Sequence, residues 1–187
     1  MLQGDNVNDK AKHYWHGDGR KLHIVPHEIL RQKVINDPLL RNLYVTGIGY
    51  YPATDLYYSF NETGTADMVI IICVSGRGTY ETGQGTFTVM PGQFFIVSTQ
   101  EWHSYQADKY DPWSIYWMCL AGLHVPELCA DPTLIRCFKP SYAHHILEQI
   151  KMFNDIYQTL DTGYTREKLK YCSMIAHHIL ALLFIHR

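Results

Sequence analysis

The stretch between Leu43 and Leu120 constrains the fold most, because short apolar and aromatic runs alternate there with Gly, Pro, Asn and Asp. Runs of this kind, rich in β-branched and aromatic residues and bounded by turn residues, are typical of β-strands. Eight strands at such close spacing predict a sandwich or a barrel. The predicted strands cover residues 43–51, 56–60, 68–75, 78–81, 86–90, 93–98, 103–107 and 113–120.

Two of the breaks have the chemistry of tight turns. Thr82-Gly83-Gln84-Gly85 predicts a short hairpin, because glycine adopts positive φ without steric cost. Pro91-Gly92 predicts a second turn, because proline fixes φ at a value that suits a turn and glycine allows positive φ at the next position.

The period of the apolar residues becomes helical after a loop that contains Pro126, Pro132 and Pro140. A first helix is predicted over residues 141–160, ending before Gly163, and a second from about residue 165 to the end of the chain. The first helix has one amphipathic face, expected to contain Ile146, Leu147, Ile150, Phe153, Ile156, Tyr157 and Leu160.

The second helix carries apolar residues at steps of three and four, which is the rhythm of a helix–helix seam. We expect this stripe to form a dimer interface. The alternative, that the helix is buried within its own domain, remains open at this point. The stripe consists of Leu169, Cys172, Ala176, Ile179 and Leu183.

Charge and cysteine content narrow the function classes. The formal net charge is −2 with histidine neutral, and no run of Lys and Arg exceeds two residues, so this chain lacks the basic stripe of a DNA-binding surface. The five cysteines are scattered without a C-x-x-C pair, which predicts buried thiols in a reducing compartment. Without a visible signal peptide or a long apolar segment, we expect a soluble, cytoplasmic protein.

A set of motifs in residues 67–122 carries a resemblance to a known family. The motifs are Gly76-x-Gly78, Gly85 placed six residues before Pro91-Gly92, His103-Ser104-Tyr105, and Trp113-Ser114-Ile115-Tyr116-Trp117; upstream lies Asn36-Asp37-Pro38-Leu39-Leu40. In order and spacing they resemble the N-terminal ligand-binding and dimerisation domain of AraC-family transcriptional regulators. The resemblance implies a mainly β fold: a cupin-like double-stranded β-helix (a jelly-roll barrel) followed by two C-terminal α-helices.

The resemblance also implies a division of the chain. Residues 1–35 form an N-terminal arm without a counterpart, residues 36–125 the effector-binding barrel, and residues 126–187 a linker and two-helix dimerisation element. In this family a helix-turn-helix DNA-binding domain follows, and it is expected beyond residue 187. The implied partners are a small effector, often a sugar, a second copy of the chain, and DNA through the C-terminal domain alone.

Candidate ligand-binding residues come partly from the resemblance, which places Tyr105 and Trp117 among the effector contacts. Because side chains alternate along a strand, Trp113 and Ile115 should share the face of Trp117, and His103 that of Tyr105. An indole beside a phenol suits a sugar, although these aromatics could also simply fill the core.

Three further positions follow from the resemblance. Pro38, in the arm match, would close over the ligand through its backbone carbonyl. Asn61 stands where the arabinose-binding member has a pocket arginine, and Ile115 where it has a pocket histidine. The pocket is therefore more apolar, arabinose itself is not expected, and a different sugar or a small aromatic molecule stays open.

Many cupins are metal enzymes, which hold the metal through His-x-His and Glu on early strands and a later His. Here His103 is the one remaining ligand, because residues 57–74 contain no histidine. A catalytic metal needs about three protein ligands, so we expect neither a metal nor a catalytic residue nor another cofactor, and His103 is interpreted as a structural histidine. The remaining alternatives are a stand-alone sugar-binding cupin and, last, a metal-dependent cupin enzyme.

Overall fold

The computed structural model describes residues 19–53, 58–61, 67–97, 102–128, 136–137 and 143–185. Its strands are β1 (Lys21–Ile24), β2 (Tyr44–Tyr51), β3 (Tyr58–Asn61), β4 (Met68–Ser75), β5 (Gly78–Thr82), β6 (Gly85–Val89), β7 (Gln93–Val97), β8 (His103–Ala107), β9 (Ser114–Ala121) and β10 (Arg136–Cys137). The helical elements are α2 (His27–Ile29), η1 (Leu30–Val34), η2 (Leu40–Asn42), α3 (Val125–Leu128), α4 (Ala143–Asp161) and α5 (Arg166–Ile185).

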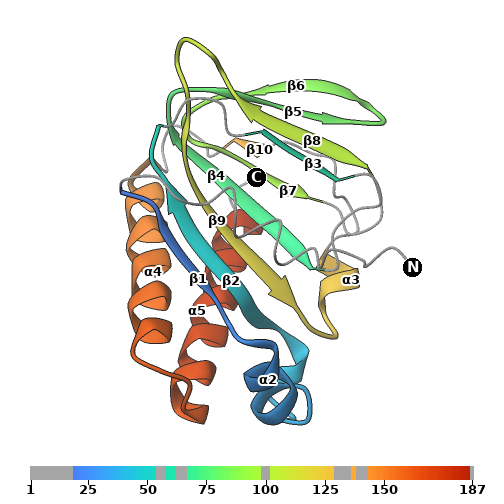
Figure 1. Cartoon of the computed structure of the whole chain (residues 1–187), viewed down its shortest axis with the longest axis vertical. Coiled ribbons are helices and arrows are strands. Elements are labelled where there is room, and N and C mark those ends of the chain that lie inside the picture. Colours follow the sequence, from blue (N-terminus) through green and yellow to red (C-terminus); the bar gives the residue numbers. More distant parts are fainter. Residues whose placement is uncertain are drawn as a thin grey trace, which may run out of the picture.

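In the described part of the chain the strands form two antiparallel sheets (Figure 1). One has the order β1-β2-β9-β4-β7-β10 and the other the order β3-β8-β5-β6. A cluster of buried side chains from both sheets fills the space between them. The expected mainly β, cupin-like barrel followed by two helices is confirmed.

Each of the eight predicted strands overlaps an observed one, with bounds that differ by at most two residues, and the predicted turns are present. Thr82 pairs with Gly85, so β5 and β6 are joined by a two-residue turn. Gly85 and Gly92 have φ values of 137° and 82°, which non-glycine residues rarely adopt.

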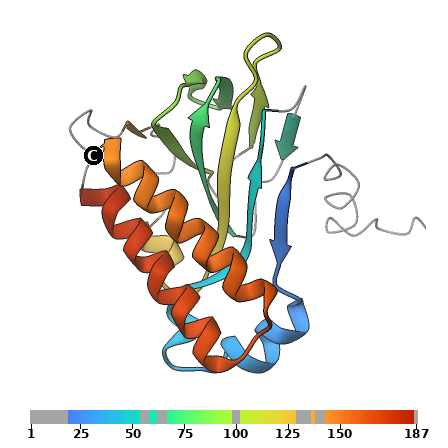
Figure 2. The same ribbon diagram turned by 90° about the vertical axis from the view of Figure 1, so that its left-hand side faces the viewer.

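The two long helices run side by side across the outer face of the six-stranded sheet (Figure 2). Phe153, Ile156 and Leu160 of α4 are buried against that face, as predicted. Leu147, however, is 71% exposed, while Gln149 is fully buried. The predicted apolar face is therefore wrong at Leu147, because the buried line of the helix passes through Gln149. No described helix is long and apolar enough to cross a bilayer.

The stripe expected as a dimer seam on α5 lies inside the chain's own core. All five residues are at most 5% exposed and belong to the cluster that packs the helices on the sheet: Leu169, Cys172, Ala176, Ile179 and Leu183. The spacing correctly marked a buried stripe, but its partners are the barrel and α4. The predicted dimer seam is therefore wrong: these residues form an intramolecular contact. A dimer contact through α5 would have to use another face of the helix.

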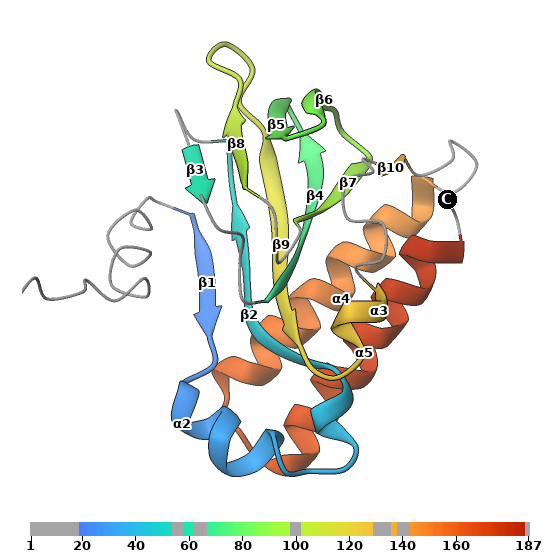
Figure 3. The same cartoon turned by 90° about the vertical axis from the view of Figure 1, so that its right-hand side faces the viewer.

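Strand β1 lies within the segment expected to be an arm and was not predicted as a strand. It pairs with β2 at the edge of the six-stranded sheet, with Lys21 opposite Tyr50 (Figure 3). Its side chains alternate between two surroundings: Leu22 packs against the barrel interior, whereas His23 faces the helix pair. Residues 19–35 are therefore joined to the barrel at one edge strand.

His23 and its neighbours hold this edge strand to the turn between α4 and α5. Its Nε2 lies 2.7 Å from the Tyr164 hydroxyl, and its Nδ1 lies 4.0 Å from a carboxylate oxygen of Asp161. Lys33 Nζ donates to the Tyr164 carbonyl at 2.8 Å. Burial lowers the pKa of His23, and the nearby Asp161 carboxylate opposes this to a lesser degree. The folded chain therefore favours neutral His23.

The lowered pKa of His23 makes the free energy of unfolding depend on pH. Because the pKa of His23 is lower in the folded chain, the unfolded chain binds more protons around the ordinary value of 6.5. The stabilisation is present above pH 6.5 and is lost as the pH falls below it. Urea unfolding of wild type and His23→Gln at pH 8 and pH 5 should show a smaller loss of midpoint in the variant.

His27→Gln is the matched control, because it removes an exposed histidine of α2. Its loss of midpoint should equal that of the wild type. Equal losses in wild type and His23→Gln would contradict the assignment of this pH dependence to His23.

Candidate ligand-binding site

The interior of the barrel gathers the residues that the sequence marked on the last long strand. Trp113, Ile115 and Trp117 are 2%, 1% and 4% exposed and all belong to the interior cluster. Met118 and Leu120 belong instead to the cluster on the helix side. The alternation predicted from strand geometry is thus present in the structure.

Strand β8 adds Tyr105 and His103 to this cluster from the opposite sheet. The Tyr105 ring centroid lies 6.4 Å from that of Trp113 and 5.9 Å from that of Phe95. The His103 and Tyr105 rings are nearly parallel, with centroids 6.3 Å apart, and His103 is 2% exposed. Trp113, Tyr105 and His103 therefore form one aromatic group between the sheets.

Trp117 occupies another part of the interior, next to the edge of the sheet. Its ring centroid lies 5.8 Å from that of Tyr51 on β2. The Arg20 guanidinium lies 5.4 Å from the Tyr51 ring on the same edge. Arg20 was not predicted as a site residue, because it falls in the segment assigned to the arm and no local pattern pairs it with Tyr51.

Two glycines make the positions of the indole rings possible. A Cβ atom on Gly78 would lie 2.2 Å from Cε3 of Trp113, and one on Gly49 would lie 2.5 Å from Cζ2 of Trp117. A Cβ on Gly76, which has a φ of 63°, would lie 2.2 Å from the Pro112 carbonyl oxygen. The Gly76-x-Gly78 motif is explained by this close approach of the chain before β9.

Two further predicted site residues, Asn61 and Pro38, are located by the position of their backbone. Asn61 lies opposite His103 in the pairing of β3 with β8, which puts its backbone at the same sheet. Pro38 lies between η1 and η2, where its carbonyl accepts a hydrogen bond from Asn42 Nδ2 at 3.2 Å. The adjacent Asp37 pairs with Arg166 at the start of α5. The structure therefore brings Pro38 to the helix pair and not to the interior cluster.

The interior cluster consists of uncharged side chains, and some of them carry hydrogen-bond donors. No described Asp, Glu, Lys or Arg is fully buried. Trp113 Nε1 is buried and has no hydrogen-bond partner among the described residues. Burial raises the pKa of the Tyr51 phenol and raises that of the Cys73 thiol to about 12, so both stay protonated. Such a site suits a neutral ligand with acceptor oxygens.

Metal-ligating side chains do not gather in the part of the chain that the structure describes. No group of three His, Cys, Asp or Glu residues there has the geometry to hold a metal ion. His103 is surrounded instead by its strand neighbours, Asn61 and Thr82 standing opposite it in the register.

Comparison with known proteins assigns the chain to a family. Residues 47–164 match the AraC-like ligand binding domain. The chain belongs to this family. The expected resemblance to the N-terminal domain of AraC-type regulators is thereby confirmed.

Two curated relatives share part of this domain. The MmsAB operon regulatory protein of Pseudomonas aeruginosa is 29% identical over 97 residues, which cover 50% of this chain and 31% of the relative. The Msm operon regulatory protein of Streptococcus mutans is 30% identical over 90 residues, 48% of this chain and 31% of the relative. The match thus spans about a third of the length of each relative.

Among solved structures, the AraC-like transcriptional activator CuxR matches with a TM-score of 0.49 and 13% identity, covering 77% of this chain and 52% of CuxR. YhaK from Escherichia coli matches with a TM-score of 0.42 and 15% identity, covering 55% of this chain and 44% of YhaK.

The glycine contacts predict a strong effect of one methyl group. Gly78→Ala would force the Trp113 ring out of its position, and overpacking of this kind costs about 1–3 kcal/mol. The urea midpoint of the variant should fall accordingly, and the near-UV circular dichroism of the tryptophans should change.

Gly83→Ala serves as the control, because the nearest side-chain atom to its new Cβ would be 3.7 Å away. This variant should unfold like the wild type. If Gly78→Ala were as stable as Gly83→Ala, Trp113 would not be held against the glycine as described.

Proposed function

We propose that this AraC-like domain senses a small neutral molecule, a sugar, in the barrel interior and thereby controls DNA binding by a helix-turn-helix domain C-terminal to it. The family match supports ligand binding, and the names of both curated relatives support a role in regulating an operon. On this proposal the domain is not an enzyme, and DNA is contacted only through the C-terminal domain.

The proposed ligand site is supported above all by the buried Trp113 N–H, which has no acceptor among the described residues. A buried N–H group without an acceptor costs about 1–3 kcal/mol, so a ligand oxygen that accepts its hydrogen bond recovers this free energy. The donor belongs to the aromatic group formed with Tyr105. Indole faces stack on the C–H groups of a sugar, while N–H and O–H groups bind its oxygens.

Two residues argue for a sugar other than arabinose. Asn61 and Ile115 offer fewer hydrogen bonds than the arginine and histidine expected at these positions in an arabinose-binding member, and Ile115 is buried in the interior cluster. A ligand with a larger apolar face and fewer hydroxyl contacts fits these residues better. A small neutral aromatic molecule is the alternative occupant.

Trp113→Phe should weaken ligand binding about tenfold, because it removes one hydrogen bond worth about 1.4 kcal/mol while keeping a ring in place. Ligands from a panel of pentoses, hexoses, disaccharides and neutral single-ring aromatics would first be selected by thermal shift. The affinity of each hit for wild type and variant would then be measured by isothermal titration.

Trp102→Phe is the matched control, since Trp102 is 38% exposed and lies outside the interior cluster. Its affinity should equal that of the wild type. Binding of neutral aromatics without any sugar would exclude the sugar, and equal affinities of Trp113→Phe and wild type would exclude this site.

We also propose that the domain dimerises through the exposed face of α5. Tyr171 and Met174 are 48% and 68% exposed and lie one turn apart, and His178 and Ala181 continue the same exposed line. Exposed apolar residues in a row on one helix are typical of a protein–protein contact. The dimer would thus use the side of α5 that faces away from its buried stripe.

Met174→Glu should therefore shift the domain from dimer to monomer, because a carboxylate would be buried in the contact. Multi-angle light scattering at several protein concentrations measures the mass directly. Leu147→Glu, at an exposed apolar position of α4, is the control and should leave the mass unchanged. An unchanged mass of Met174→Glu would refute this face; Leu183→Glu is unsuitable, since Leu183 is 1% exposed and its change would unfold the core.

A further inference from the structure

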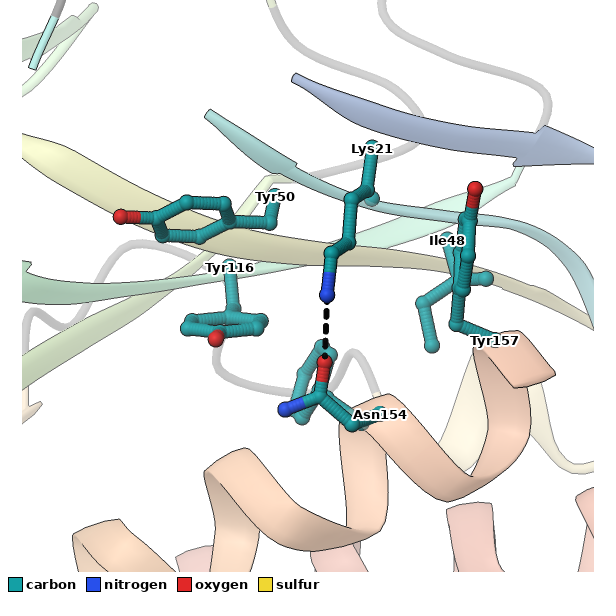
Figure 4. Close-up of a pocket in the computed structure, with 8 residues that line it drawn as sticks. Lys21, Ile48, Tyr50, Tyr116, Asn154 and Tyr157 are labelled. Atoms are coloured by element: carbon teal, nitrogen blue, oxygen red, sulfur yellow. Dashed lines mark hydrogen bonds between the residues drawn. The ribbon is translucent and has the colours of Figure 1, made fainter. Parts of the chain in front are cut away.

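Two hollows lie outside the barrel, on the side of the molecule that carries the helices. The first lies between β1, β2, β9 and α4, and the Lys21 side chain occupies it, with Nζ 3.5 Å from Asn154 Oδ1 (Figure 4). Its free space is about 10 Å³, which is room for one water molecule. The second lies between α3 and α5, and its free space is about 280 Å³. This value is close to the lower end of the roughly 300–1,000 Å³ found in sites for organic ligands.

The second hollow, called the α3–α5 groove below, is formed by two elements that are distant in the sequence and lie side by side in the fold (Figure 3). At the start of α3, the His124 N–H donates to the Asn42 carbonyl at 2.9 Å. On α5, the Ser173 hydroxyl donates to the Leu43 carbonyl at 2.6 Å. Both walls are therefore fixed to one short segment before β2. The described residues that line the groove are His124, Glu127, Leu128, His177, Leu180 and Ala181.

The base of the α3–α5 groove is apolar. Leu180 is 3% exposed and belongs to the cluster that packs the helices on the sheet, and Leu128 packs against the same cluster. Ala181 adds a small apolar side chain at the next position of α5. The apolar part of a ligand placed here would leave water together with these side chains, which favours binding.

His177 gives the groove a hydrogen-bond acceptor. Its Nδ1 lies 2.9 Å from the Ser173 carbonyl oxygen, one turn earlier in α5. Because a carbonyl oxygen can only accept, Nδ1 carries the proton, and Nε2 of the neutral ring keeps its lone pair on the side away from the helix backbone. The His124 ring stands edge-to-face to the His177 ring, with 6.3 Å between centroids.

Glu127 gives the groove a negative charge. Its side chain is exposed and makes no hydrogen bond or ion pair with another described residue. No lysine or arginine is among the described residues that line the groove. An anionic ligand would therefore face a carboxylate without a compensating cation, whereas a cationic ligand gains an ion pair. The charge of the groove selects a cation.

We propose that the α3–α5 groove is a second ligand site, which takes a small organic cation: an amine with one ring or a short apolar chain. The ammonium group pairs with the Glu127 carboxylate and donates to His177 Nε2, and the apolar part lies on Leu128 and Leu180. The site is independent of the barrel interior in its residues and in the charge of its ligand.

A second copy of the chain is the competing occupant of the groove. Ala181 lines the groove and also belongs to the proposed dimer face on α5, so the two surfaces adjoin. A dimer partner that filled the groove would exclude the amine from it. The monomeric variant Met174→Glu distinguishes these two occupants.

The test uses three compounds of similar shape and different charge: benzylamine, benzyl alcohol and benzoate. Each is titrated into the protein at low ionic strength and pH 8, where imidazole is neutral and an alkylamine is charged, and is followed by the amide resonances of residues 124–128 and 177–181. We expect benzylamine to bind, benzyl alcohol to bind more weakly, and benzoate not to bind. Glu127→Gln should weaken benzylamine binding about threefold, as expected for an exposed ion pair. His177→Phe keeps a ring, removes the acceptor, and should weaken binding by a similar factor.

Glu167→Gln is the matched control, because Glu167 is exposed in the first turn of α5 and does not line the groove. It should bind benzylamine like the wild type. Trp113→Phe should do so as well, which separates this site from the interior one. Absence of benzylamine binding, equal binding of benzoate, or an unchanged affinity in Glu127→Gln would overturn the proposal. Binding to Met174→Glu but not to the wild type would also overturn it, since the second copy would then fill the groove.

Discussion

The burial of the six-stranded sheet on both faces is the constraint on which the rest of the structure depends. Strand β9 shows it most directly: Ile115 and Trp117 face the barrel interior, while Met118 and Leu120 face the helices. Because side chains alternate along a strand, a shift of one residue in its pairing would exchange these two sets. The register of β9 with β2 and β4 therefore fixes both the ligand-binding interior and the surface on which α4 and α5 rest.

Glycines within this framework determine where the large rings can lie. Gly49 on β2 leaves the space that the Trp117 indole occupies, and the same position is close to the Lys21 carbonyl of β1. The backbones of two strands and one side chain thus meet at a point where no Cβ fits. Because a packed interior transmits displacement, a movement of Trp117 on ligand binding would shift β1 and, through β1, the helix pair.

The sequence predicted the strands and helices well because turn residues and apolar periodicity are local signals. Strand β1 was not predicted, because its sequence pattern is short and half polar. Its pairing with β2 depends on contacts such as that of His23 with Tyr164, 141 residues away. The stripe of α5 was correctly predicted as buried, but spacing cannot tell whether the covering surface belongs to the same chain. Strand alternation alone predicts that Trp113, Ile115 and Trp117 share a face. The lack of an acceptor for the Trp113 N–H can be recognised only from the surrounding atoms of the folded structure. Pro38 was assigned from the resemblance; in the structure its carbonyl accepts a hydrogen bond from Asn42, and the adjacent Asp37 pairs with Arg166 of α5.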